Sequence, residues 1–370
     1  MNRKINYAIY GLIFWFLAFL VWEWSKSYPK VQWNPIPFPK TKAERLDSLC
    51  IQSLSDFLIP GLAIGIIEDG KVSYLKTFGY QNLESKDSLL LSSRIPVASV
   101  SKMFTALAIS SHFSSQEISI SKPIGELFPS NSRIPDFLEK ITIEELLRHN
   151  SGLKDPGAFT KLLKIGSDRG LEKILPNIPP PNELKNEAFY ADVNFDLAGW
   201  VLQEHSGVPF DSLVKSLTFF QAGMNSSSFV RKWPEIDNSI SGYGRTFFWK
   251  RIEPKRLELE RYPSPSSGLV TTPQDLSNAL LHLVRGDLSD FSSELDWLRG
   301  EQDLPAGFQS IHLENQNFLG HFGEQAGYSS LFAFSVEKET GFFILTNAKD
   351  LQDHRVKIAS SILHILSANP

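Results

Sequence analysis

The sequence predicts a mixed α/β fold of the α+β type, in which strands from both ends of the chain form one sheet around an inserted helical lobe. Strand patterns occur early and return late, whereas the middle, about residues 120–261, shows helical patterns interrupted by Pro and Gly. The expected strands are residues 61–67, 72–75, 318–321, 329–336 and 341–346. With 370 residues, 42% of them apolar, the chain can build one large core or two closely packed lobes.

The N-terminus differs from the rest of the chain. Arg3 and Lys4 precede an apolar run over residues 7–22, a pattern that resembles an export signal. The run ends in Val-Trp-Glu-Trp instead of the small residues of a cleavage site, so residues 1–24 are interpreted as a signal-anchor, with a cleaved signal peptide as the alternative. We therefore expect a bacterial-type cell membrane location with an extracytoplasmic domain, either periplasmic or on the cell surface.

A linker and a single large domain follow. Residues 25–40 contain four prolines and little periodicity, which predicts an extended spacer of up to about 50 Å that lifts the domain off the membrane. The domain is expected over residues 41–367. Its sheet lobe should comprise about 41–98 and 262–367, and its helical lobe about 99–261.

Local patterns predict the elements in order. Residues 41–57 form a helix whose apolar positions include Cys50, which should lie in the core. The first two strands enclose an Asp-Gly turn and form a hairpin. The apolar run over 103–109 suits a largely buried helix, and residues 349–367 suit a closing helix.

Composition excludes several function classes. The formal net charge of −4, without a basic patch or an arginine-rich arm, gives no electrostatic basis for nucleic-acid binding. The single cysteine allows neither an intrachain disulfide nor a cysteine metal cluster. The sequence lacks the His-Glu-x-x-His motif of zinc hydrolases and the Gly-x-Ser-x-Gly motif of α/β-hydrolases. We expect no metal and no cofactor.

Ser99 and Lys102 are the main catalytic candidates. One helical turn separates them, so hydroxyl and amine share a face, and a serine needs such a neighbouring base to become a nucleophile. Ser99 would also lie at a helix N-terminus, where backbone amides favour developing negative charge. The same spacing occurs elsewhere, starting at Ser27, Ser73, Ser119, Ser151, Ser212 and Ser335. The alternative from this segment alone is that Ser99 is an N-cap and Lys102 a surface residue.

Further segments follow this pair in an order that resembles the serine β-lactamase and penicillin-binding-protein superfamily, specifically the class C β-lactamase-related hydrolases. Residues 141–153 are similar to the family's "LLxHxSGL" segment, 220–224 to "PLGM" and 267–276 to "GGLxSTxxDL". The resemblance covers about residues 41–365 and implies a β-lactamase/transpeptidase-like fold, with a mainly antiparallel sheet flanked by helices and an all-helical lobe.

The resemblance also implies the site. Tyr190-Ala191-Asp192 matches the family's Tyr-x-Asn motif, and His321-Phe322-Gly323 matches Lys-Thr-Gly in a His-x-Gly form. Tyr190 would move protons between Ser99 and the leaving group, and Asp192 would hold Lys102 or a substrate amide; alone, Asp192 could instead cap a helix.

The same resemblance assigns His321 to the cleft, where it would bind substrate or share protons without the permanent charge of a lysine. Gly323 belongs to the substrate-binding strand. The backbone amides of Ser99 and Glu324 would stabilise the oxyanion. The other histidines, His149 among them, are interpreted as surface or satisfied interior residues.

These features predict an anchored serine hydrolase that forms an acyl-enzyme with an ester or amide. D-alanyl peptides, β-lactams and small esters all fit, so the expected partner is a small-molecule or peptidoglycan-derived substrate, and the oligomeric state stays open. The alternative is a catalytically silent, penicillin-binding-like sensor or interaction protein of the cell envelope. Intact Ser99, Lys102 and Tyr190 favour the enzyme.

Overall fold

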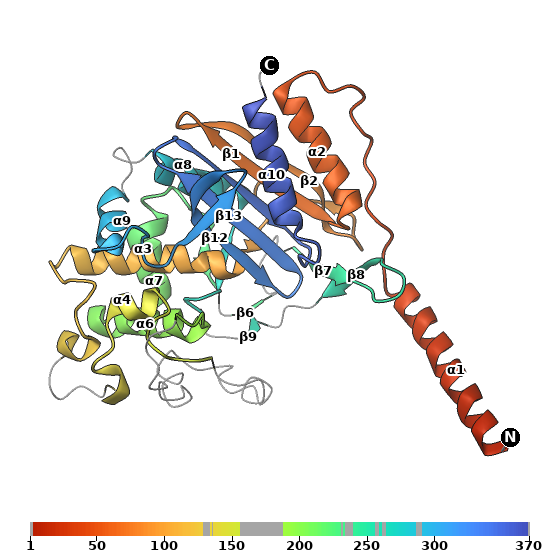
Figure 1. The fold of residues 1–370 in the computed structure, drawn as a ribbon, viewed down its shortest axis with the longest axis horizontal. Coiled ribbons are helices and arrows are strands. Elements are labelled where there is room, and N and C mark those ends of the chain that lie inside the picture. Colours follow the sequence, from red (N-terminus) through yellow and green to blue (C-terminus); the bar gives the residue numbers. More distant parts are fainter. Residues whose placement is uncertain are drawn as a thin grey trace.

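We analysed a computed structural model of the chain. It describes residues 3–128, 134, 136–155, 188–230, 232–233, 240–255, 259–260, 264–285 and 291–368. In this part of the chain a sheet lies between layers of helices, and one long helix at the N-terminus projects away from the other elements (Figure 1).

The strands from the two ends of the chain form one sheet, as predicted. They are β1 (Gly61–Glu68), β2 (Lys71–Asn82), β3 (Asp87–Ser88), β11 (Gln309–Leu313), β12 (Gln316–Gln325), β13 (Tyr328–Ser335) and β14 (Thr340–Thr346). Within the described residues they make a seven-stranded antiparallel sheet in the order β11-β12-β13-β14-β1-β2-β3. The N-terminal strands join the C-terminal strands where β1 pairs with β14, with Ile64 opposite Ile344.

Helices cover both faces of this sheet (Figure 1). They include α2 (Lys42–Asp56), α3 (Ser101–Ser114), α8 (Pro273–Val284), α9 (Ser292–Arg299) and α10 (His354–Ser367). Leu62, Ile64 and Ile66 of β1 belong to one apolar core together with residues of α2 and α10. Ala63 and Ile67 belong to a second core with residues of α3 and α8. This alternation is the period of two expected for a strand that is buried on both faces.

The predicted helical lobe is only partly helical. Its described part contains α3, the turns η2 (Ile124–Leu127) and η3 (Asp136–Leu138), α4 (Ile143–Leu147), α6 (Asp192–Ser206), α7 (Phe210–Val214) and η6 (Lys215–Phe219). Residues 156–187, including three of the prolines that interrupt the helical pattern in the sequence, Pro179-Pro180-Pro181, lie outside the described residues.

Short strands replace the helices predicted near the end of this lobe. They are β5 (Ser228–Phe229), β6 (Lys232–Trp233), β7 (Gly242–Arg245), β8 (Ile252–Lys255) and β9 (Leu259–Glu260), while β4 (Ile95–Pro96) and β10 (Leu269–Thr271) flank the lobe. Long-range pairing explains the difference, because β5 pairs with β10, and the Tyr243 backbone of β7 bonds Gly327 and Asn347. Such pairing overrides a local helical pattern.

The N-terminal helix α1 (Arg3–Ser25) contains the single candidate membrane span found among the described residues, Tyr7–Ser25. The segment after it does not form the expected spacer. Tyr28 exchanges two backbone hydrogen bonds with Ile252, at 2.7 and 3.0 Å, and Val31 is buried. The start of the segment 26–40 therefore packs against the domain, and the segment does not separate the domain from the end of α1 (Figure 1).

Candidate active site

A strained turn positions Ser99. Residues Ala98–Val100 form the 3₁₀ turn η1, which leads directly into α3. Ala98 has a φ of 48°, a conformation that costs free energy for a residue with a Cβ and persists only when neighbouring contacts hold it. Ser101 supplies one such contact, because its hydroxyl donates to the Ala98 carbonyl over 2.6 Å and accepts from the Leu269 amide over 3.0 Å.

The Lys102 side chain is fully buried, and its ammonium has three partners. Nζ donates to Ser99 Oγ at 3.2 Å, to Asp192 Oδ1 at 2.7 Å and to the Ser266 carbonyl at 3.0 Å. An ammonium has three donors, so this set satisfies it completely. Burial is the largest single influence and acts to lower the pKa of Lys102, but its interactions with Asp192 and Tyr190 together outweigh burial, so the pKa lies above the ordinary lysine value. Lys102 is therefore protonated in the resting site.

Asp192 reaches Lys102 from α6. It is the first residue of that helix, Ala191 occupies the N-cap position, and the Asp155 carboxylate accepts from the Val193 amide. The interpretation of Asp192 as a helix cap is therefore wrong: its carboxylate bonds Lys102, and Asp155 bonds the helix amide instead.

Tyr190 lies just before α6, with its ring centroid 4.9 Å from Lys102 Nζ. The side chain remains 47% exposed, so the phenol is accessible from solvent. Its ring packs against His149 at 4.4 Å and lies 6.3 Å from the ring of His321. Tyr190 thus contacts buried Lys102 and is at the same time exposed to solvent.

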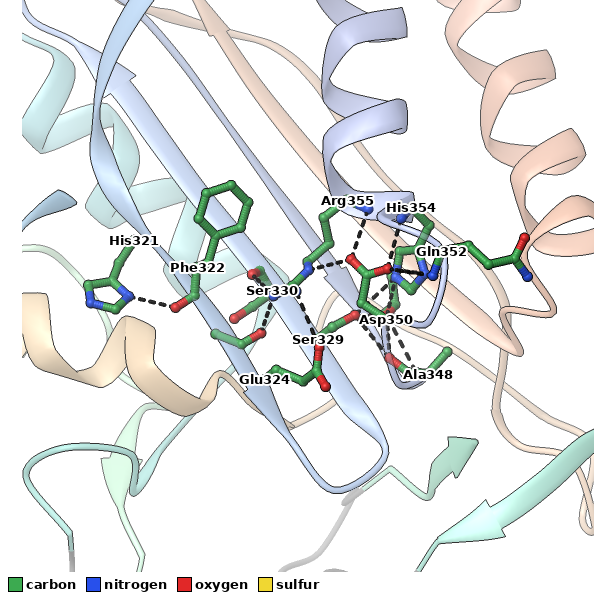
Figure 2. Close-up of polar contacts among 12 residues, drawn as sticks. His321, Phe322, Glu324, Ser329, Ser330, Ala348, Asp350, Gln352, His354 and Arg355 are labelled. Carbon is green, nitrogen blue, oxygen red and sulfur yellow. Dashed lines mark hydrogen bonds and ion pairs between the residues drawn. The ribbon is translucent and has the colours of Figure 1, made fainter. Parts of the chain in front are cut away.

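His321 is a buried, neutral histidine on β12. Burial, and then the charge of Lys102, lower its pKa to about 3. Its Nδ1 contacts the Phe322 carbonyl, which can only accept, so Nδ1 carries the proton and Nε2 keeps its lone pair (Figure 2). The ring offers an acceptor, not a positive charge, at neutral pH.

Gly323 brings β12 against the turn that carries Ser99. A Cβ at this position would lie 2.2 Å from the Val97 carbonyl oxygen, 2.3 Å from Ser330 Oγ and 3.2 Å from the Ser99 amide. Only glycine allows this approach. Ser330 of β13 donates to the same Val97 carbonyl over 2.8 Å, so the two strands hold the turn together. This places the Gly323 backbone beside the Ser99 amide.

A charged network supports β12 from α10 (Figure 2). Arg355 donates to the Gly323 carbonyl at 2.6 Å and to the Ser330 carbonyl at 3.2 Å. Asp350 accepts from Arg355 Nε at 2.7 Å, and Glu324 accepts from the same guanidinium at 3.3 Å. The guanidinium therefore ties β12 to β13.

The structure thus brings Ser99, Lys102, Tyr190, Asp192, His321 and Gly323 together, and Glu324 follows Gly323 on β12. Among the described residues, no group of three or more metal-ligating side chains assembles. The site offers a serine hydroxyl, a buried ammonium, a phenol and a neutral imidazole, a set suited to acyl transfer through proton movement.

Comparison with known proteins agrees with this geometry. The sequence model of the Beta-lactamase family matches residues 50–366. The chain belongs to the β-lactamase family. Members of the family are serine hydrolases, and membership therefore supports a hydrolase activity for this chain.

Curated relatives of this β-lactamase family chain are distant. Protein flp from Staphylococcus aureus strain NCTC 8325 is 22% identical over 320 residues, which cover 82% of this chain and 63% of that protein. Penicillin-binding protein 4* from Bacillus subtilis strain 168 is 25% identical over 338 residues, covering 82% of this chain and 71% of its own length. The chain thus spans less than two thirds of the length of the Staphylococcus aureus relative.

Two solved structures share the fold. The octameric penicillin-binding protein homologue from Pyrococcus abyssi has a TM-score of 0.69 and 24% identity, covering 87% of this chain and 76% of its own. The D-amino acid amidase from Ochrobactrum anthropi SV3 has a TM-score of 0.69 and 18% identity, covering 87% of this chain and 98% of its own.

Sequence reasoning missed four contributors to this β-lactamase family site. Arg355, Ser330 and the Ser266 carbonyl lie outside the motifs or act through the backbone, so only their contacts reveal them. His149 was expected to be an ordinary histidine. It is half-buried, with Nδ1 accepting from the Ala191 amide, and its ring packs against that of Tyr190. Its place inside the "LLxHxSGL" segment was the available signal.

Asp192→Asn should reduce stability at neutral pH. Breaking a buried ion pair costs about 3–5 kcal/mol, but Asp192 is 39% exposed and asparagine still accepts a hydrogen bond, so we expect about 1–2 kcal/mol. Because the pKa of Lys102 is raised in the folded state, this stabilisation is complete below the ordinary lysine pKa and is lost as pH rises through the raised value.

Urea unfolding of both proteins between pH 7 and pH 11, at roughly 0.5 M denaturant steps, measures this difference. Asp296→Asn is the matched control, because Asp296 pairs with Arg299 on the surface. A difference that grows towards high pH would contradict the assignment of Lys102 as protonated.

Proposed function

We propose that this protein is a membrane-anchored serine hydrolase in which Ser99 attacks an ester or amide carbonyl and forms an acyl-enzyme. The observation that carries this proposal is the 3.2 Å contact between Ser99 Oγ and the fully buried Nζ of Lys102. A lysine with no exposed surface, fixed on a serine hydroxyl at a helix N-terminus, suits nucleophilic catalysis better than a surface role.

Lys102 and Tyr190 share the proton transfer in this proposal. Since Asp192 keeps Lys102 protonated, the ammonium donates to Ser99 Oγ and cannot itself take the serine proton at rest. The Tyr190 hydroxyl, beside that ammonium, relays the proton: its oxygen accepts the proton of Ser99 as Ser99 attacks, and its own proton passes to the leaving group. Water then releases the acyl group by the reverse path.

The backbone amides of Ser99 and Glu324 receive the oxyanion. The close approach of Gly323 to the Ser99 amide supports this role, and each such donor contributes about 3 kcal/mol to transition-state stabilisation in comparable sites. Arg355 positions this strand through the Gly323 carbonyl.

Neutral His321 favours substrates that present no carboxylate to β12. A permanent positive charge would bind a carboxylate there, whereas the pKa of about 3 leaves the imidazole uncharged. We therefore propose an ester or an amide whose neutral group donates a hydrogen bond to Nε2. The amidase named among the structural neighbours acts on amides, which is consistent with this range.

Two activity-based probes test the mechanism and divide the substrate range. A fluorophosphonate should label the full chain at Ser99, located by mass spectrometry of the labelled peptide, and heat-unfolded protein should not react. A fluorescent penicillin carries a carboxylate, so we expect weaker labelling by it. Failure of both probes would exclude the covalent mechanism, and equally fast labelling by both would contradict the role given to His321.

A further inference from the structure

The loop between β7 and β8 carries three exposed aromatic residues in sequence. Phe247, Phe248 and Trp249 are 71%, 44% and 44% exposed, and we call them the aromatic tip. Large apolar side chains gathered on one loop mark an interaction surface. Figure 1 places this hairpin beside the C-terminal end of α1.

Glu23 of α1 fixes the aromatic tip to the helix. Its carboxylate accepts from the backbone amides of all three tip residues, and Glu23 itself is only 4% exposed. The Trp249 indole donates to the Leu20 carbonyl over 2.9 Å. These bonds satisfy a carboxylate and an indole that would otherwise be costly to place near a bilayer.

Ring contacts continue towards the middle of α1. The Phe248 ring lies 5.2 Å from Phe16 and 6.0 Å from Phe19. Phe16 precedes Ser25 by nine residues, which is about 14 Å along a helix. The candidate span Tyr7–Ser25 has 19 residues, about 28 Å, so all of it is needed to cross a hydrocarbon core of about 30 Å. With α1 in the bilayer, Phe248 must lie inside the hydrocarbon.

Basic side chains lie near the C-terminal end of α1, at the level where the membrane–water interface would be. The Arg251 guanidinium sits 4.0 Å from the Trp24 ring and donates to the Ser27 hydroxyl at 2.9 Å and to its carbonyl at 3.0 Å. Lys250 follows the tip as an exposed residue, and its ammonium donates to the Phe247 carbonyl over 2.6 Å. Tryptophan with Lys and Arg at one level is typical of a membrane interface.

We infer that the aromatic tip inserts into the bilayer beside α1, so that helix and loop form a two-part anchor that holds the hydrolase domain in one orientation at the membrane surface. The acyl chains of the lipid are the partner that the aromatic tip contacts. This inference rests on the proposed membrane anchoring and requires that α1 be retained, because Glu23 supplies the acceptor for the tip amides.

Site-specific fluorescence in vesicles tests the insertion. Full-length protein with Cys50→Ala receives one cysteine by Phe247→Cys, Leu12→Cys or Val72→Cys, is labelled with the environment-sensitive dye NBD and is reconstituted into phosphatidylcholine vesicles. Leu12 lies in α1, and Val72 is an exposed position on β2. Doxyl-labelled lipids then quench only the dyes that lie in hydrocarbon.

We expect blue-shifted emission and doxyl quenching for the dye at 247 and for the dye at 12, and neither effect at 72. Quenching at 12 without quenching at 247 would overturn the insertion while leaving the anchor in place. Absence of quenching at both positions would overturn the anchor and the insertion together. A blue shift at 247 without doxyl quenching would show that protein, not lipid, covers the aromatic tip and would overturn the lipid assignment.

Discussion

Ser99→Ala should lower turnover by about 10⁴-fold or more and abolish labelling by the fluorophosphonate. Alanine has no nucleophile, so only substrate binding and the oxyanion amides remain to favour hydrolysis. The fold should persist, since the Ser99 hydroxyl is half-buried and bonds Lys102, which keeps Asp192 and the Ser266 carbonyl as partners. Initial rates on a chromogenic ester and circular dichroism measure the two effects.

Ser73→Ala is the matched control. Ser73 has the same spacing from Lys76, and Lys76 also pairs with an aspartate, Asp47, at 2.7 Å. However, Lys76 is half-exposed and the pair lies on a strand, so we expect unchanged turnover. Equal, measurable turnover of Ser99→Ala and wild type would contradict Ser99 as the nucleophile. Absence of turnover in both proteins would favour the silent sensor if the Ser99→Ala cells kept the phenotype that deletion removes.

Gly323→Ala should lower turnover by about 10²–10³-fold, the loss typical of one missing oxyanion donor. The new Cβ would press on the Val97 carbonyl and on Ser330 Oγ, and the shift that relieves this separates β12 from the Ser99 turn. Overpacking also destabilises by about 1–3 kcal/mol. Ester hydrolysis and urea unfolding, measured on the same preparations, separate the two losses.

Gly341→Ala provides the control for overpacking alone. Its Cβ would lie 2.8 Å from Leu280 Cδ1 and 3.0 Å from the Ala333 carbonyl, away from the Ser99 turn. We expect comparable destabilisation with unchanged turnover. Adding Ser330→Ala to Gly323→Ala removes one of the two close contacts and should restore part of the activity. Wild-type turnover in Gly323→Ala would show that the approach of β12 does not matter for catalysis.

The sequence by itself determined the elements whose cause is local. The hairpin β1–β2, the strands β12 to β14 and the helices α2 and α10 follow from apolar periodicity and turn residues close in the chain. The shared face of Ser99 and Lys102 is equally local, since three residues separate them. Motif order indicated Tyr190, Asp192 and His321, but it could not give their contacts.

Only the tertiary structure decided the electrostatics of the site and the arrangement of the short strands and the linker. Asp192 lies 90 residues from Lys102 in sequence, so whether it caps α6 or holds the ammonium depends on how α3 and α6 pack. Among the short strands near residues 228–260, β5 pairs with β10, and the hairpin of β7 and β8 is bonded to Gly327, Asn347 and Tyr28, which are distant in sequence. The linker lies on the domain because Tyr28 meets Ile252. Each outcome depends on long-range contacts, which local periodicity does not encode.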